Sequence, residues 1–100
     1  LIGYNELSNK YKIDINDSIT LKLFKLLHGY KKDKNKSLIN MSIYLIDQFF
    51  FNLINENKNK IDFLSNLRRV IINKINDSLL YNLNINSVLN SIEIQLKNVR

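Results

Sequence analysis

The chain lacks several residue types on which catalytic, metal-binding and disulfide chemistry commonly depends. Its 100 residues contain no cysteine, proline, tryptophan or alanine, with only two glycines and one histidine. Without cysteine there is neither a disulfide nor a thiolate metal site, which fits the cytoplasm or another reducing intracellular compartment. Gly3 and Gly29 stand far apart, so no glycine-rich loop of the phosphate-binding type is present.

The remaining polar residues do not form a recognisable catalytic or metal motif. His28 is the only histidine, and a nucleophilic triad would need it beside an activated Ser or Cys. The Asp-x-Asn-x-Ser run at 14–18 resembles the start of a calcium loop. However, Ile19 occupies the position that needs Gly, and Lys25 the position that needs Glu. We therefore expect no catalytic residue, no cofactor, no metal site and no small-molecule substrate.

What the sequence does contain is one long apolar run, residues 37–55, with Asp47 as its only charge. Its main apolar positions recur at helical spacing: Leu38, Met41, Leu45, Phe49 and Leu53. Ser37 is placed to cap this helix. The apolar part has about 17 residues, interrupted by polar ones, against the roughly 20 that a membrane span needs. We therefore predict a central core helix that other helices enclose.

Helical periodicity also appears on both sides of this run. A helix from about residue 19 to 30 follows capping residues at 16–18, and Gly29 is interpreted as its C-terminal signal. A further helix is expected over 62–80 and another over 87–100, with a short one near residues 4–11. Residues 92–96 also alternate like a strand, but no second strand is evident to pair with it.

These elements predict an all-α fold, a small bundle of four to five helices around the central helix at about 38–54. Residues 1–100 then form a single domain. Because the chain begins at Leu1 without an initiator Met, we interpret it as part of a longer protein.

The net charge of +6 allows two interpretations. A basic balance raises nucleic acid as a partner, but the abundance of Ile, Asn and Lys and the lack of Ala and Pro are typical of an AT-rich genome. Codon drift then accounts for much of the charge. The candidate basic contacts Lys31, Lys32, Lys34 and Lys36 fall within one connection. This connection is a phosphate-contacting loop or, as the simpler interpretation, a solvated turn.

The C-terminal 40 residues carry a family resemblance. The runs DFLSNLRRVIINKI and SLLYNLNINSVLNSIEIQLKNV resemble the C-terminal collar domain of clamp-loader subunits, with the delta-prime type of bacterial DNA polymerase III the closest. The shared marks are a basic residue after Leu67, an Asn-containing break at 84–86 and a last helix rich in apolar residues. The segment LFKLLHGYKKDKNKSL resembles an earlier helix and charged turn of the same domain.

This resemblance implies a non-catalytic oligomerisation domain that holds subunits together during DNA replication. Its partners are then other protein subunits in a hetero-oligomer, with DNA contacted only indirectly or weakly and no membrane involved. The candidate interface residues are Arg68, Arg69, Leu83, Ile85 and Ile94. Two alternatives remain open: a helical interaction module of a regulatory protein, and a small basic helical domain that binds nucleic acid.

Overall fold

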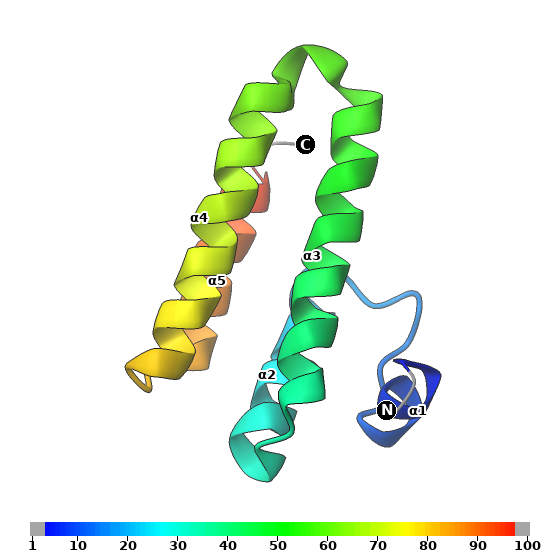
Figure 1. Cartoon of the computed structure of the whole chain (residues 1–100), viewed down its shortest axis with the longest axis vertical. Helices are drawn as coiled ribbons and strands as arrows, with labels where there is room; N and C mark the ends of the chain where they lie inside the picture. Colours follow the sequence, from blue (N-terminus) through cyan, green and yellow to red (C-terminus); the bar gives the residue numbers. More distant parts are fainter. Residues whose placement is uncertain (1–3, 98–100) are drawn as a thin grey trace.

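The computed structural model describes residues 4–97, and all regular structure in this range is helical (Figure 1). The all-α class is thereby confirmed. A short 3-10 helix, η1 (Lys58–Lys60), leads directly into α4. The five α-helices are α1 (Tyr4–Lys10), α2 (Ile19–Asp33), α3 (Lys36–Glu56), α4 (Ile61–Leu80) and α5 (Ile85–Lys97). Helix α5 runs through residues 92–96, so the helix expected there in preference to a strand is confirmed.

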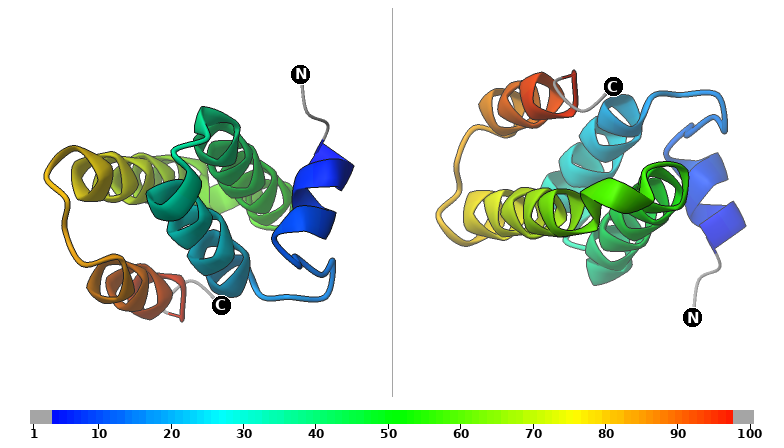
Figure 2. Two further views of the ribbon diagram at one scale, coloured as in Figure 1. Left: turned by 90° about the horizontal axis from the view of Figure 1, so that it is seen from below. Right: turned by 90° about the horizontal axis from the view of Figure 1, so that it is seen from above.

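Helices α2 to α5 form a four-sided bundle. Helix α3 packs against α2 and α4, and α5 closes the bundle by packing against α4 and α2. The views along the bundle show α1 on the outside, beside α2 and α3 (Figure 2). The α2–α3 side of the bundle is therefore opposite the α4–α5 side.

The main core lies between these four helices. It is built from residues at helical spacing on each inner face: Leu23, Leu27, Ile46, Phe50, Leu64, Ile71, Ile75, Ile85, Leu89, Ile92 and Leu96. Two buried hydroxyl groups satisfy their hydrogen bonds within their own helices. Ser42 donates to the carbonyl of Leu38 at 2.8 Å, and Ser78 donates to that of Ile75 at 2.7 Å.

A second, smaller core joins α1 to the outer side of α2 and α3. Leu7 of α1 is fully buried against Leu26 of α2 and against Leu38 and Met41 of α3. This seven-residue helix thus covers apolar surface that α2 and α3 would otherwise expose to water.

Helix α3 is confirmed as the long apolar helix of the bundle, but it is buried on one side only. Its fully buried apolar residues face α1, α2 and α4, whereas Tyr44 and Phe51 are 44% and 61% exposed. The expected central apolar helix is confirmed, with its inner side packed against the neighbouring helices. Each helix of a four-sided bundle has only two adjacent neighbours, which leaves its outer face open. By length and composition alone α3 could also cross a membrane, a property it shares with core helices of soluble proteins.

The helix starts were predicted in part. Ser18 caps α2 as expected, its Oγ accepting from the Leu21 amide at 3.2 Å. The cap of α3 is Asn35 rather than Ser37, with Asn35 Oδ1 accepting from the Ser37 amide at 3.0 Å. Asn and Ser are both good caps, so their order in the chain did not decide between them.

Gly29 does not end α2, which continues to Asp33. The glycine is buried where Tyr11 and Leu38 approach the helix, and a Cβ there would lie 2.6 Å from Cε1 of Tyr11. Its role is close packing between α2 and the chain after α1. The Tyr11 hydroxyl donates to Asp33, which holds the ring in this place.

Non-glycine residues close three of the helices. Lys12, Lys34 and Asn82 have φ values of 57°, 56° and 53°, in the left-handed region where glycine is usual. After α4, the Leu83 amide donates to the carbonyl of Ser78 at 2.9 Å and completes the turn. A chain with so few glycines therefore carries backbone strain at its helix ends.

Substitution Gly29→Ala should lower the free energy of unfolding by up to about 2 kcal/mol. Overpacking against the Tyr11 ring costs about 1 to 3 kcal/mol, more than the roughly 1 kcal/mol gained in helix propensity. Chemical denaturation measures the difference. Ser65→Ala, at an exposed position of α4, is the control and should be neutral or stabilising; an equal response of the two variants would contradict the close packing.

Substitution Lys12→Gly should raise the free energy of unfolding by about 1 kcal/mol, because glycine adopts the left-handed conformation without a Cβ penalty. The Lys12 side chain is exposed, and the carbonyl that Lys25 contacts is retained. The matched variant Lys10→Gly, within α1, should be destabilising instead. Thermal unfolding of both variants measures the contrast, and destabilisation by Lys12→Gly would refute this account of the turn.

Candidate functional site

No group of three or more potential metal ligands occurs among residues 4–97. In the calcium-like run at 14–18, the Asp14 carboxylate accepts from the Asn16 amide at 2.9 Å. Asp17 accepts from the Asp14 amide at 3.0 Å and from Lys25 Nζ at 2.8 Å. The ammonium group of Lys25 thus lies against the carboxylate of this loop, and the loop serves as the turn before α2.

Three of the predicted interface residues are engaged within the domain. Arg68 Nε donates to Asp47 Oδ1 at 2.6 Å, an ion pair that joins α4 to α3. Arg69 donates to Asn66 of its own helix at 2.8 Å, and because adjacent residues of a helix lie about 100° apart, the two arginines point in different directions. Ile85 is 2% exposed and belongs to the main core, so its side chain is not presented to a partner here.

The other two predicted residues, Leu83 and Ile94, are exposed on the α4–α5 side. A hollow of about 430 Å³ lies between these helices, lined by Lys74, Asp77, Leu83, Asn84, Ser87, Val88 and Ser91. Ile94 follows Ser87 and Ser91 at helical spacing, so it extends the same strip of α5. The serines are small and leave room between the two helices.

Helix α4 contributes two further apolar residues to this side. Phe63 and Val70 precede Lys74 and Asp77 at intervals that place all four on one strip of α4. Phe63 is 55% exposed and Val70 is 41% exposed. We name Phe63, Val70, Leu83 and Ile94, with the hollow beside them, the α4–α5 face. It lies opposite the α2–α3 side, and among residues 4–97 a further helix, α1, covers the α2–α3 side alone.

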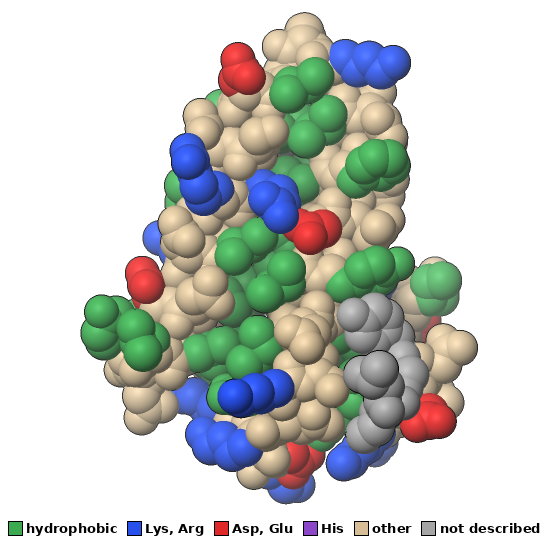
Figure 3. Space-filling model, in the orientation of Figure 1, with side chains coloured by type: hydrophobic (Ala, Val, Ile, Leu, Met, Phe, Trp, Pro, Cys, Tyr) green, Lys and Arg blue, Asp and Glu red, His purple; other side chains and the backbone are tan. Residues whose placement is uncertain are grey.

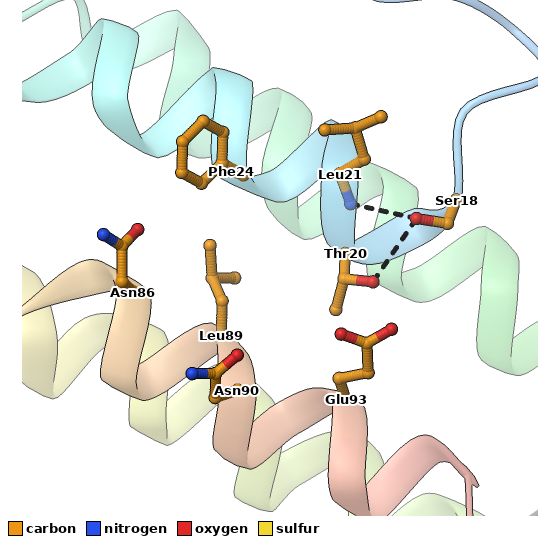
Figure 4. Close-up of a pocket in the computed structure, with 8 residues that line it drawn as sticks. All are labelled: Ser18, Thr20, Leu21, Phe24, Asn86, Leu89, Asn90 and Glu93. Carbon is orange, nitrogen blue, oxygen red and sulfur yellow. Dashed lines mark hydrogen bonds between the residues drawn. The ribbon is translucent and has the colours of Figure 1, made fainter.

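A second hollow of about 360 Å³ lies between α2 and α5 (Figure 4). Leu21 and Phe24 line it from α2, and Leu89 lies at its α5 wall. Polar groups surround this apolar centre, with Glu93 of α5 opposite the first turn of α2. Further along α2, His28 hydrogen-bonds to Asn86 of α5 at 3.3 Å. This contact holds the two helices together at the other end of the hollow.

Phe63 and Val70 lie at the edge of the apolar stripe of α4, and Leu21 and Phe24 lie at the edge of that of α2. The sequence does indicate that some of these residues are exposed, because an apolar arc wider than one helix face can bury only part of its width. Which edge stays exposed depends on where the neighbouring helices lie. That arrangement could not be read from periodicity alone.

The four candidate lysines of the α2–α3 connection are all exposed. Lys31 and Lys32 belong to the last turn of α2, Lys34 is the residue after it, and Lys36 begins α3. Lys and Arg side chains gather at this end of the molecule in the space-filling view, and a separate basic group marks the opposite end (Figure 3). Only Lys34 and Asn35 separate the two helices, so the connection is shorter than the expected 31–36.

Comparison with known proteins yields no relative: no protein-family model, curated protein or solved structure matches this chain. The interpretation of the α4–α5 face therefore depends on geometry and chemistry.

The loop before α2 should make stability depend on acid pH. The hydrogen bond from Lys25, helped by the Asp14 amide, lowers the pKa of Asp17 below its usual value of 3.8. The carboxylate thus stabilises the fold above that value, and this contribution is lost as the pH falls through the lowered pKa. Asp17→Asn should be less stable than the parent at neutral pH, with the difference vanishing under acid conditions.

Urea denaturation across the acid range measures this loss. Asp77→Asn is the matched control, since Asp77 is exposed and forms no ion pair with another described residue. It should not lower stability at neutral pH. A difference between Asp17→Asn and the parent that persists at the lowest pH would contradict the proposed contribution of the ion pair.

Proposed function

We propose that this domain is a non-catalytic helical association domain that binds another protein subunit through the α4–α5 face. The observation that carries the proposal is the group of large apolar side chains exposed there, which includes Phe63 at 55% and Ile94 at 62%. A small domain exposes such a group at a cost in solubility unless a partner covers it.

The size of this side fits a stable interface. A typical complex buries about 800 Å² on each partner, which is about one eighth of the 6583 Å² of accessible surface. One side of a four-sided bundle provides that area. The aromatic ring of Phe63 and the branched side chain of Ile94 supply the apolar anchors around which such interfaces are built.

The form of the partner surface is suggested by the other side of the same bundle. There, Leu7 of a short helix fills the apolar surface between α2 and α3. The α4–α5 face offers a comparable setting, with a hollow whose α5 wall includes Ser87 and Ser91. An amphipathic helix of another subunit fits this setting by inserting apolar side chains at helical spacing.

The specific form of the proposal is a collar domain of a clamp-loader subunit, which the resemblance of the C-terminal 40 residues implies. In that role the domain contributes apolar contacts that hold neighbouring subunits together while the clamp is placed on DNA. It requires no reactive group. The broader role of a helical interaction module in a regulatory protein would use the same face.

Co-expression with the clamp-loader subunits of the source organism tests both the association through the α4–α5 face and the specific role as a collar domain. The domain should co-purify with them, and Phe63→Lys with Ile94→Lys should weaken the association at least about tenfold, since each anchor contributes about 1 kcal/mol or more. Ile15→Lys with Phe51→Lys is the matched control, with side chains 86% and 61% exposed at other positions.

Circular dichroism of both double variants confirms that they fold before binding is compared. An equal loss of association in the two pairs would refute the assignment of the face. A folded domain that does not bind clamp-loader subunits would remove the collar role. Binding to a different protein, lost only in the first pair, would favour the regulatory module.

A further inference from the structure

We propose that the α2–α3 turn binds the phosphate backbone of single-stranded nucleic acid. We name residues 31–36 the lysine turn. Four lysines and one aspartate give it a net charge of +3, half of the +6 of the whole chain. Codon drift would distribute lysines along the chain, whereas this concentration places a positive field at one end of the bundle.

The lysines of this turn are available to a ligand. All four are exposed, and none forms a salt bridge with another described residue. The single acid of the turn, Asp33, is engaged elsewhere: it accepts a hydrogen bond from the Tyr11 hydroxyl and lies 4.0 Å from Lys10 Nζ. Lys10 offsets its charge, so Asp33 does not neutralise the lysines of the turn.

The backbone brings these lysines to one end of the molecule. Lys34 adopts the left-handed conformation that ends α2, and Asn35 caps α3 directly afterwards. Lysines from the last turn of α2 and from the first residue of α3 therefore share a convex end. Their exposure on the surface suits an extended polyanion rather than a small, enclosed anion.

An exposed aromatic residue lies in the neighbouring loop. Lys31 Nζ reaches the carbonyl of Leu83 at 3.5 Å, which places the α4–α5 loop beside the lysine turn. Tyr81 in that loop is 67% exposed. Proteins stack unpaired bases on exposed rings while lysines contact the phosphates, so Tyr81, two residues before Leu83, is the candidate ring for stacking. This favours a single strand over a duplex.

A membrane surface is the competing polyanion, but the lysine turn itself does not favour it. Residues 31–36 include no apolar side chain that would enter a bilayer, and stable membrane attachment usually combines basic charge with buried apolar area. The lysines alone provide the salt-sensitive contacts typical of phosphate-backbone binding.

Fluorescence anisotropy with a labelled single-stranded DNA oligonucleotide of mixed sequence tests the proposal over a range of salt concentrations. For four phosphate contacts, the logarithm of the binding constant should fall against the logarithm of salt with a slope of about −3. Lys32→Gln with Lys36→Gln should make the slope shallower by about 1.4. Tyr81→Ala should reduce affinity about tenfold with the slope unchanged.

The matched control is Lys58→Gln with Lys60→Gln. It removes the same charge from the exposed η1 helix, at the other end of α3 and about 30 Å away. It should leave the slope unchanged. Equal effects of the two lysine pairs would overturn the proposal, because binding would then depend on net charge alone.

Two other results would also overturn it: no binding to the oligonucleotide at low salt, or binding only to phosphatidylserine vesicles in a parallel flotation assay. Failure here is distinguishable from failure of the association function, because none of these substitutions lies among Phe63, Val70, Leu83 and Ile94. The reverse also holds for Phe63→Lys with Ile94→Lys, which leaves the lysine turn intact.

Discussion

The rest of the structure depends on a mismatch between apolar surface and available neighbours. Each helix of the four-sided bundle has two adjacent partners, yet the apolar arcs of α2, α3 and α4 are wider than two contacts can cover. In α3, Phe50 is 1% exposed while the next residue, Phe51, is 61% exposed. The short helix α1 covers part of this surplus through Leu7. What remains uncovered includes the α4–α5 face that we propose as an association surface.

Periodicity predicted the helices well because the inward-facing positions repeat along each of them, as Leu64, Ile71 and Ile75 do in α4. The helix ends were harder to predict, since several residues near each end could serve as the cap. Ser37 and Asn35 both suit a cap, and only the backbone shows which amide is satisfied. Gly29 was misread because glycine serves both helix ends and close contacts; the ring of Tyr11, 18 positions earlier, decides between them.

The α4–α5 face was predicted only in part, because the exact start of α5 was not known from the sequence. Leu83 and Ile85 are two residues apart, but Leu83 belongs to the loop and is exposed, whereas Ile85 begins α5 and enters the core. A shift of two residues in the expected start of α5, from 87 to 85, was enough to change the role of Ile85. Phe63 and Val70 were recognised as apolar without their direction, which depends on the position of α5 relative to α4.

The two proposed surfaces occupy different parts of the bundle, and this separation has a physical basis. Apolar association needs a broad side between two helices, so the α4–α5 face runs along the bundle. Binding of a polyanion instead needs positively charged side chains that stay exposed to solvent. The lysines at the end of the bundle meet this requirement. The α4–α5 loop lies where they meet, with Leu83 exposed on the face and its carbonyl contacted by Lys31. Because Tyr81 and Leu83 belong to the same short loop, the two proposed surfaces adjoin there.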